Sequence, residues 1–230
     1  MELVVIVLVA AAALGIAYLV CYGGLEGPVD WAMHTVSHGD RERRVIALTF
    51  DDGPDPARTP ALLDALAELD CKATFFCVGA SVDEHPSLAA RMVREGHEIG
   101  NHTYTHRYLP TTRSKSVEKE LRLTDRAIAK ATGVTPTLAR PPWGGRSPWT
   151  VRAFRRLAKR VVLWDVNSFD WKDEPAGEVA RRVLERARPG SIVLMHDGGR
   201  DHSITVDAVR MLVPELRARG YELVTVSSAV

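Results

Sequence analysis

The sequence lacks the features of several common classes of protein. Its 30 basic and 29 acidic residues leave a net charge of +1, so no overall field favours nucleic acid or an anionic membrane surface. No glycine-rich phosphate loop of the type G-x-G-x-x-G follows the first predicted strand, which argues against nucleotide binding. Repeats and low-complexity segments are also absent. The balanced charge favours a substrate that is neutral or recognised locally, and we infer no protein partner from the sequence.

Cysteine is scarce, with three residues in 230. Cys21, Cys71 and Cys77 form no metal-type pair. Cys71 and Cys77 bracket one predicted strand, and an extended chain holds them too far apart to bridge. We therefore expect no structural disulfide. The chain length and the 46% of hydrophobic residues suit one globular α/β domain.

An uncharged apolar run from Leu3 to Val20 stands apart from the rest of the chain. At about 1.5 Å per residue it is long enough to span most of a bilayer core as a helix. A buried core helix is the alternative, but the terminal position and the Gly-rich stretch that follows favour a membrane helix. A charged leader and a small-residue cleavage site are missing, so we expect the segment to stay uncleaved. The predicted organisation is an anchor over 1–22, a tether over 23–44 and a folded domain over 45–230.

Strand and helix patterns alternate along the folded domain. They predict strands at 45–50, 72–78, 97–100, 137–139, 160–164, 191–195 and 222–226, and helices at 57–69, 86–95, 114–132, 150–158, 176–187 and 205–219. About seven such alternations imply parallel strands, either in a barrel or in an open doubly wound sheet. Unusual polar residues follow many of the strands, whereas an open sheet concentrates its site at one switch point. The pattern therefore favours an α/β barrel.

Two adjacent carboxylates, Asp51 and Asp52, end the first buried strand in the sequence Leu48-Thr49-Phe50-Asp51-Asp52-Gly53-Pro54. Asp residues before Gly-Pro commonly terminate a strand or cap a helix. The alternative is that one carboxylate binds a metal while its neighbour serves as a general base. The downstream clusters bear on this choice.

Two histidines, His102 and His106, are four residues apart, so on a helical turn both would face one side and could share a metal. Such a pair is about as often found on a protein surface with no metal bound. Asp52, from a neighbouring strand end, would complete a three-ligand site. Three protein ligands leave positions open for water and substrate, which is typical of a catalytic metal. Two nitrogens and one oxygen suit Zn, Co, Ni or Mn, and the donor set does not rank these metals.

A cation, Arg140, begins the stiff sequence Arg-Pro-Pro-Trp-Gly-Gly at another strand end. An ordinary loop with a solvated arginine would have the same pattern. In the functional interpretation Arg140 pairs with Asp51 and orients it, while a main-chain N–H in the Trp143 turn donates to an oxyanion.

Two later clusters follow the fifth and sixth predicted strands. Trp164 ends an apolar strand and is expected in the core. Asp170 and Trp171 lie past the strand end, where a carboxylate and an indole are more useful to a ligand than to a core. His196 ends a buried strand and is a natural general acid at neutral pH, although a lone histidine there is more often structural.

Taken in order, the motifs T-F-D-D-G-P, H-T-x-x-H, R-P-P-W-G, D-W and L-x-H resemble those of the polysaccharide deacetylases, the NodB-homology domain of carbohydrate esterase family four. The similarity spans residues 44–226. It implies a distorted (β/α) barrel of about seven strand-helix units and metal-dependent removal of N- or O-acetyl groups from sugars. Residue by residue, it implies Asp51 as the base, Asp52, His102 and His106 as metal ligands, Arg140 as the residue orienting the base, Asp170 as the partner of the acid His196, and Pro142, Trp143, Trp171 and Leu194 as substrate contacts.

The resemblance also suggests a class of substrate. A membrane-tethered domain outside the cytoplasm suggests an acetylated amino-sugar glycan of the cell wall or a secreted polymer, with peptidoglycan or a chitin-like oligosaccharide ahead of acetylxylan. One departure is Trp143, where the family often has tyrosine. If the backbone N–H is the active group there, the change affects sugar contacts more than catalysis. The alternatives are a non-catalytic glycan-binding protein of the same fold and a metallohydrolase of a small non-sugar amide.

Overall fold

A central strand, β1 (Val45–Asp51), organises the computed structural model, which describes residues 5–9, 15, 35–172, 174–199 and 203–230. All seven β1 residues are buried, as expected for a strand covered on both faces of a parallel sheet. It pairs with β2 (Thr74–Cys77) on one side and with β7 (Ser191–His196) on the other. Asp51 is paired in register with His196, so these two strands deliver their polar ends at the same level.

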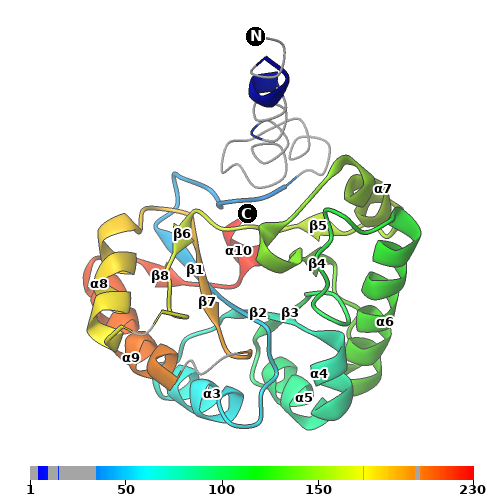
Figure 1. Cartoon of the computed structure of the whole chain (residues 1–230). Coiled ribbons are helices and arrows are strands. Elements are labelled where there is room, and N and C mark those ends of the chain that lie inside the picture. The colour runs from blue at the N-terminus through cyan, green and yellow to red at the C-terminus, as the bar shows by residue number, and fades with distance from the viewer. Residues whose placement is uncertain (1–4, 10–14, 16–34, 173, 200–202) are drawn as a thin grey trace.

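The remaining strands extend the sheet to the order β5-β4-β3-β2-β1-β7-β6, and β8 also pairs with β1. Their bounds are Glu98–Asn101 (β3), Leu138–Ala139 (β4), Arg160–Val161 (β5), Val166–Asn167 (β6) and Glu222–Leu223 (β8). Every pairing is parallel. Within the described ranges no ladder joins β5 to β6, so the barrel is incomplete (Figure 1). The predicted parallel α/β fold is confirmed in this partial-barrel form.

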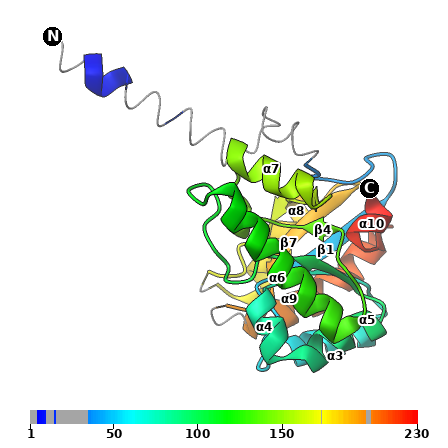
Figure 2. The same cartoon turned by 90° about the vertical axis from the view of Figure 1, so that its right-hand side faces the viewer.

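Helices cover the outside of the sheet (Figures 1 and 2). Their bounds are Thr59–Glu68 (α3), Gly79–Glu84 (α4), Pro86–Arg94 (α5), Ser114–Thr132 (α6), Pro148–Arg156 (α7), Ala176–Arg186 (α8), Ser203–Ala218 (α9) and Val226–Ala229 (α10), with a 3₁₀ turn, η1, at Pro142–Gly144. The main core lies between β1, β2 and β7 and the helices α3, α5, α8 and α9. α6 is capped at its carboxyl end by Gly133, whose φ of 76° is the left-handed conformation that suits glycine.

The longer elements agree with the sequence prediction, and the short ones account for the differences. α6 has the predicted bounds, and β1, β2 and β7 differ from theirs by one or two residues. α4 and β6 were not predicted, and the last predicted strand, 222–226, ends at Leu223. A two-residue strand such as β6 has no periodicity that a sequence pattern can register.

The predicted membrane anchor, residues 1–22, lies almost entirely outside the described residues. Residues 5–9 are helical with exposed apolar side chains and lie apart from the domain (Figure 2). In the part of the chain that the structure describes, no helix is both long and apolar enough to cross a bilayer. The end of the predicted tether lies against the domain, since Val36 pairs with Val162 and Arg41 donates to Asp165 Oδ2 at 2.8 Å.

Candidate active site

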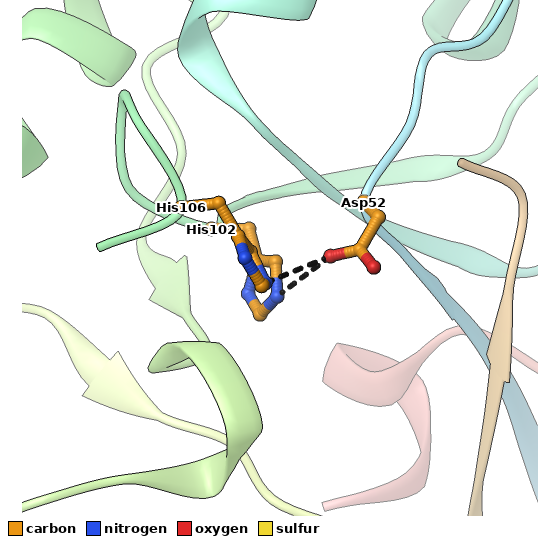
Figure 3. Close-up of side chains that lie close together, drawn as sticks. All are labelled: Asp52, His102 and His106. Atoms are coloured by element: carbon orange, nitrogen blue, oxygen red, sulfur yellow. Dashed lines mark ion pairs between the residues drawn. The ribbon is translucent and has the colours of Figure 1, made fainter. Parts of the chain in front are cut away.

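Two imidazoles and a carboxylate meet at the carboxyl end of the sheet (Figure 3). Asp52 follows β1, while His102 and His106 lie in the loop after β3. Asp52 Oδ1 is 3.3 Å from His102 Nε2 and 3.0 Å from His106 Nε2. One ligand atom from each residue lies within 4.8 Å of the other two. The structure thus brings together the three residues predicted as ligands, and the ligand role itself stays a prediction.

The prediction that a helical turn presents the two histidines is wrong. Residues 102–106 form an irregular loop, and Thr103 and His106 both have positive φ, 67° and 51°. The buried carboxylate of Glu120 on α6 causes this shape, because it accepts the main-chain N–H groups of Tyr104 at 3.0 Å and of Thr105 at 2.8 Å. These donors are therefore satisfied by a side chain and not by a helix. The signal that could have revealed Glu120 is its acidic side chain on the apolar face of α6.

The three residues fit a divalent cation. His102 Nδ1 lies 2.7 Å from the main-chain oxygen of Arg140, so Nδ1 carries the proton and donates it, which leaves the Nε2 lone pair directed at the cluster. Asp52 Oδ1 is buried, and it accepts no hydrogen bond from the described residues. A buried, unpartnered carboxylate oxygen beside two imidazole nitrogens is a donor set that a metal ion satisfies.

Asp51 is held by a fully buried arginine, as the sequence predicted. Arg140 donates from one terminal nitrogen to Asp51 Oδ1 and to Thr49 Oγ1, each at 2.7 Å. Its remaining N–H groups bond main-chain carbonyls of residues 162 and 163, and the guanidinium lies over the ring of Phe76. Asp51 Oδ2 is 3.7 Å from His102 Nε2. The arginine therefore fixes one oxygen of Asp51 and turns the other toward the predicted metal ligands.

Asp170 and His196 form a second pair, in which Asp170 is fully buried and His196 is half-buried. His196 Nδ1 lies 2.9 Å from Asp170 Oδ1, while Asp170 Oδ2 accepts the main-chain N–H of His196 and the hydroxyl of Thr205, each at 2.8 Å. Burial opposes the imidazolium, but the hydrogen bond and charge of Asp170 outweigh it and raise the pKa of His196 from 6.5 to about 9. The pKa of Asp170 is correspondingly lowered although burial opposes its charge. His196 thus holds a proton at neutral pH.

A cavity of about 670 Å³ joins these groups. Trp143, Trp171 and Leu194 line it as predicted, together with Asp51, both predicted ligand histidines and His196. Trp164, which we expected in the core, is half-buried and also lines the cavity. Pro142 is buried and is not among the lining residues, so its contact with substrate stays a prediction.

Trp143 has an unusual backbone. Its φ of 54° lies in the left-handed region, which is uncommon for a bulky residue and costs conformational free energy. The residue is 58% exposed, and its indole ring centroid lies 4.4 Å from that of His106. The main-chain N–H of Trp143 bonds no main-chain acceptor of the described residues. A strained turn that leaves an N–H open beside the cavity agrees with the predicted oxyanion donor.

Asp197, to which the sequence pattern assigned no role, joins the two loops that carry the site. It is 2% exposed and accepts the Thr59 hydroxyl at 2.6 Å. Burial and the neighbouring charges of Asp51 and Asp52 raise its pKa to about 7 despite the hydrogen bond from Thr59. A Cβ at Gly53 would lie 2.2 Å from Asp197 Oδ2, so only glycine allows this approach of the β1 and β7 loops.

Comparison with known proteins gives consistent matches. The family model described as polysaccharide deacetylase matches residues 38–162. A peptidoglycan-N-acetylglucosamine deacetylase from Bacillus cereus is 38% identical over 186 residues, which cover 80% of this chain and 87% of the relative. Some other curated deacetylases are longer, and the chain spans only 38 to 39% of their length.

Solved structures agree with the sequence matches. The crystal structure of a peptidoglycan N-acetylglucosamine deacetylase in complex with a naphthalenyl N-hydroxybenzamide has a TM-score of 0.84 and 32% identity, covering 88% of this chain and 96% of that one. A CE4 family pseudoenzyme from Bacillus anthracis has a TM-score of 0.80 and 29% identity, covering 85% and 68% of the two chains. The fold is thus shared by a deacetylase and a pseudoenzyme, and the side chains of the site must distinguish the two.

Proposed function

The chain belongs to the polysaccharide deacetylase family, and from this premise we propose that it is a metal-dependent hydrolase that removes acetyl groups from N-acetylated amino sugars of a cell-wall glycan. The observation that carries the proposal is the convergence of three groups on one cavity: the Asp52, His102 and His106 cluster, the Asp51–Arg140 pair and the Asp170–His196 pair. The similarity to deacetylases of peptidoglycan N-acetylglucosamine supports that unit as the first substrate.

Different residues of the chain have different roles in the proposed reaction. A divalent ion held by Asp52, His102 and His106, with zinc as the first expectation and Co, Ni or Mn as alternatives, would supply Lewis-acid polarisation to the acetyl carbonyl and the attacking water. Asp51, oriented by Arg140, accepts a proton from that water as the general base.

Other groups that line the cavity stabilise the oxyanion and protonate the leaving group. The main-chain N–H of Trp143 donates a hydrogen bond to the oxyanion. His196 donates its Nε2 proton to the departing amine, because its Nδ1 is held by Asp170. Trp171, whose ring centroid is 5.2 Å from that of His196, and Leu194 form the apolar wall for the acetyl methyl group.

A non-catalytic glycan-binding protein is the competing function, because this fold also occurs in a pseudoenzyme. Loss of the base, the acid or a ligand would be the expected signature of such a protein. Here Asp51, His196 and the three proposed ligand residues are all present and line the same cavity. Their arrangement favours catalysis over binding alone.

Acetate release tests the function. We expect the full chain to release acetate from peptidoglycan or chitooligosaccharides, with little release from acetylxylan. A chelator should abolish most of the activity, and Zn, Co, Ni or Mn added one at a time should restore it to different extents. Enzymatic acetate assays, with heat-treated protein as the control, measure both effects. Activity that is indifferent to exhaustive chelation, or no acetate from any N-acetylated glycan with any metal, contradicts the proposal.

We also propose that residues 1–22 anchor the chain in a membrane, with the catalytic domain on the extracytoplasmic side. Support comes from the uncharged run Leu3 to Val20 and from the exposed apolar side chains of residues 5–9, such as Leu8 at 64%. Full-length protein expressed in bacteria should sediment with membranes and be digested by protease added to spheroplasts. Deletion of residues 1–31 should release a soluble, active domain, because all site residues and the Val36 and Arg41 contacts remain. Full-length protein in the cytosolic fraction would contradict the anchor.

A further inference from the structure

Exposed aromatic rings are unevenly placed on the domain. Among the described residues of 35–230, six large hydrophobic side chains are exposed, and four of them are aromatic: Tyr108, Trp143, Trp149 and Trp171. Trp143 and Trp171 line the cavity of the candidate active site. The other two do not line it. An indole that stays in water forgoes the free energy that burial would give, so its exposure needs a reason.

Tyr108 and Trp149 are connected to the cavity through Trp143 and Pro110. The ring centroid of Tyr108 lies 6.1 Å from that of Trp143. The indole N–H of Trp149 donates to the main-chain oxygen of Pro110 at 2.7 Å. The proline ring in turn packs against Gly145, where a Cβ would lie 3.0 Å from Pro110 Cγ. Both rings therefore belong to or contact the segment 108–110 that follows His106: Tyr108 lies in it beside the cavity residue Trp143, and Trp149 is bonded to Pro110.

Trp149 is held in place while its face stays exposed. It lies in the first turn of α7, directly after Pro148, whose fixed φ suits a helix start. The bond to Pro110 restrains the indole, yet 57% of the residue remains exposed. A restrained side chain loses little conformational entropy when a ligand stacks on it. These are the properties of a preformed binding surface.

We propose that Trp149 and Tyr108, which do not line the cavity, form an outer sugar subsite that binds a pyranose ring beyond the disaccharide unit held in the cavity, on the same glycan whose acetyl group is hydrolysed there. This inference rests on the proposed function. A pyranose ring has a flat face of C–H groups and a polar edge, so it stacks on an aromatic face while its hydroxyls stay in water. Two partly exposed rings are too small for a protein interface, which needs about 800 Å² per partner. The continuity with the cavity at Trp143 favours a glycan that extends from it.

The subsite predicts a dependence on substrate length. For full-length protein acting on chitooligosaccharides, kcat/KM should rise from the dimer to longer oligomers. Trp149→Ala should lower kcat/KM for the hexamer by about three- to tenfold, mainly through KM, and leave the dimer unchanged. Tyr108→Ala should act in the same direction, and Trp149→Phe should restore most of the loss. Met211→Ala, which removes another exposed hydrophobic side chain, on α9, is the matched control.

Binding measurements separate the subsite from the reaction. Calorimetric titration of the same oligomers into Asp51→Asn protein should give affinities that increase with length, and the added Trp149→Ala change should remove that increase. If the unaltered chain releases no acetate, the proposed function fails while these titrations still test the subsite. The subsite is refuted if Trp149→Ala matches Met211→Ala at every length, or if it weakens the dimer as much as the hexamer.

Discussion

Asp52→Ala is expected to lose bound metal and activity together, whereas Asp51→Asn should keep the metal and lose only the rate. Asp52 Oδ1 faces both imidazole Nε2 atoms and has no other partner among the described residues, so its loss would remove one of the three proposed ligands. Loss of a residue that only hydrogen-bonds a metal ligand typically lowers metal affinity roughly 10- to 100-fold. Loss of Asp52, a proposed ligand itself, should lower the metal affinity by more. Asp51 instead accepts a hydrogen bond from Arg140 through one of its oxygens, Oδ1. Without its basic oxygen the rate should fall about 10²- to 10⁴-fold.

Metal content by elemental analysis and kcat/KM for acetate release measure the two effects on the same preparations. Folding must be checked for Asp51→Asn, because it removes the countercharge of a fully buried arginine and can cost about 3–5 kcal/mol of stability. Thr49 and two main-chain carbonyls still accept from Arg140, so we expect a lower Tm but a folded protein. Equal metal loss in the two variants, both folded, would rule out the division between ligand and base.

The parts of the fold that the sequence predicts well are those set by local pattern. β1 is covered on both faces, so it reads as an apolar run that stops where its carboxylates begin. α6 has a long amphipathic period and a glycine at its end, and its bounds follow from both. The strand ends of a parallel sheet meet at one edge, which is why motifs far apart in the sequence could be assigned to one site.

The parts that the sequence does not predict depend on contacts between distant residues. The loop carrying His106 is shaped by Glu120, whose carboxylate satisfies main-chain donors 15 and 16 residues earlier in the chain. Thr205, on α9, fixes Asp170 from 35 residues away, and a threonine in a helix gives no signal of that role. Trp143 adopts a positive φ that no propensity for tryptophan would suggest.

Asp170→Asn should move the alkaline limb of the pH–rate profile to lower pH and reduce the maximal rate. The proposed acid, His196, can donate a proton only while protonated, so with a pKa of about 9 its contribution should be present below that pH and lost as the pH rises through it. A cation at the metal cluster would lower this pKa somewhat. Without the Asp170 hydrogen bond and charge, burial opposes the imidazolium and only the charges of Asp51 and Asp52, which a bound cation would offset, favour it, so the pKa should fall to about its ordinary 6.5. At pH 8 the protonated fraction, and with it the rate, should fall about 30-fold or more.

The hydrogen bonds that Asp170 accepts determine which control variant this experiment needs. Its two oxygens face three donors, His196 Nδ1–H, the His196 main-chain N–H and the Thr205 hydroxyl, and asparagine has only one acceptor oxygen. Asp170→Asn should therefore also lose about 1–3 kcal/mol of stability, measured by denaturant unfolding. Thr205→Val removes one of these donors but keeps the carboxylate charge, so its alkaline limb should stay close to that of the unaltered protein. Metal content should be unchanged in both variants. If the limb of Asp170→Asn stays in place on a substrate with no ionisation of its own, Asp170 does not tune His196 and another group is the acid.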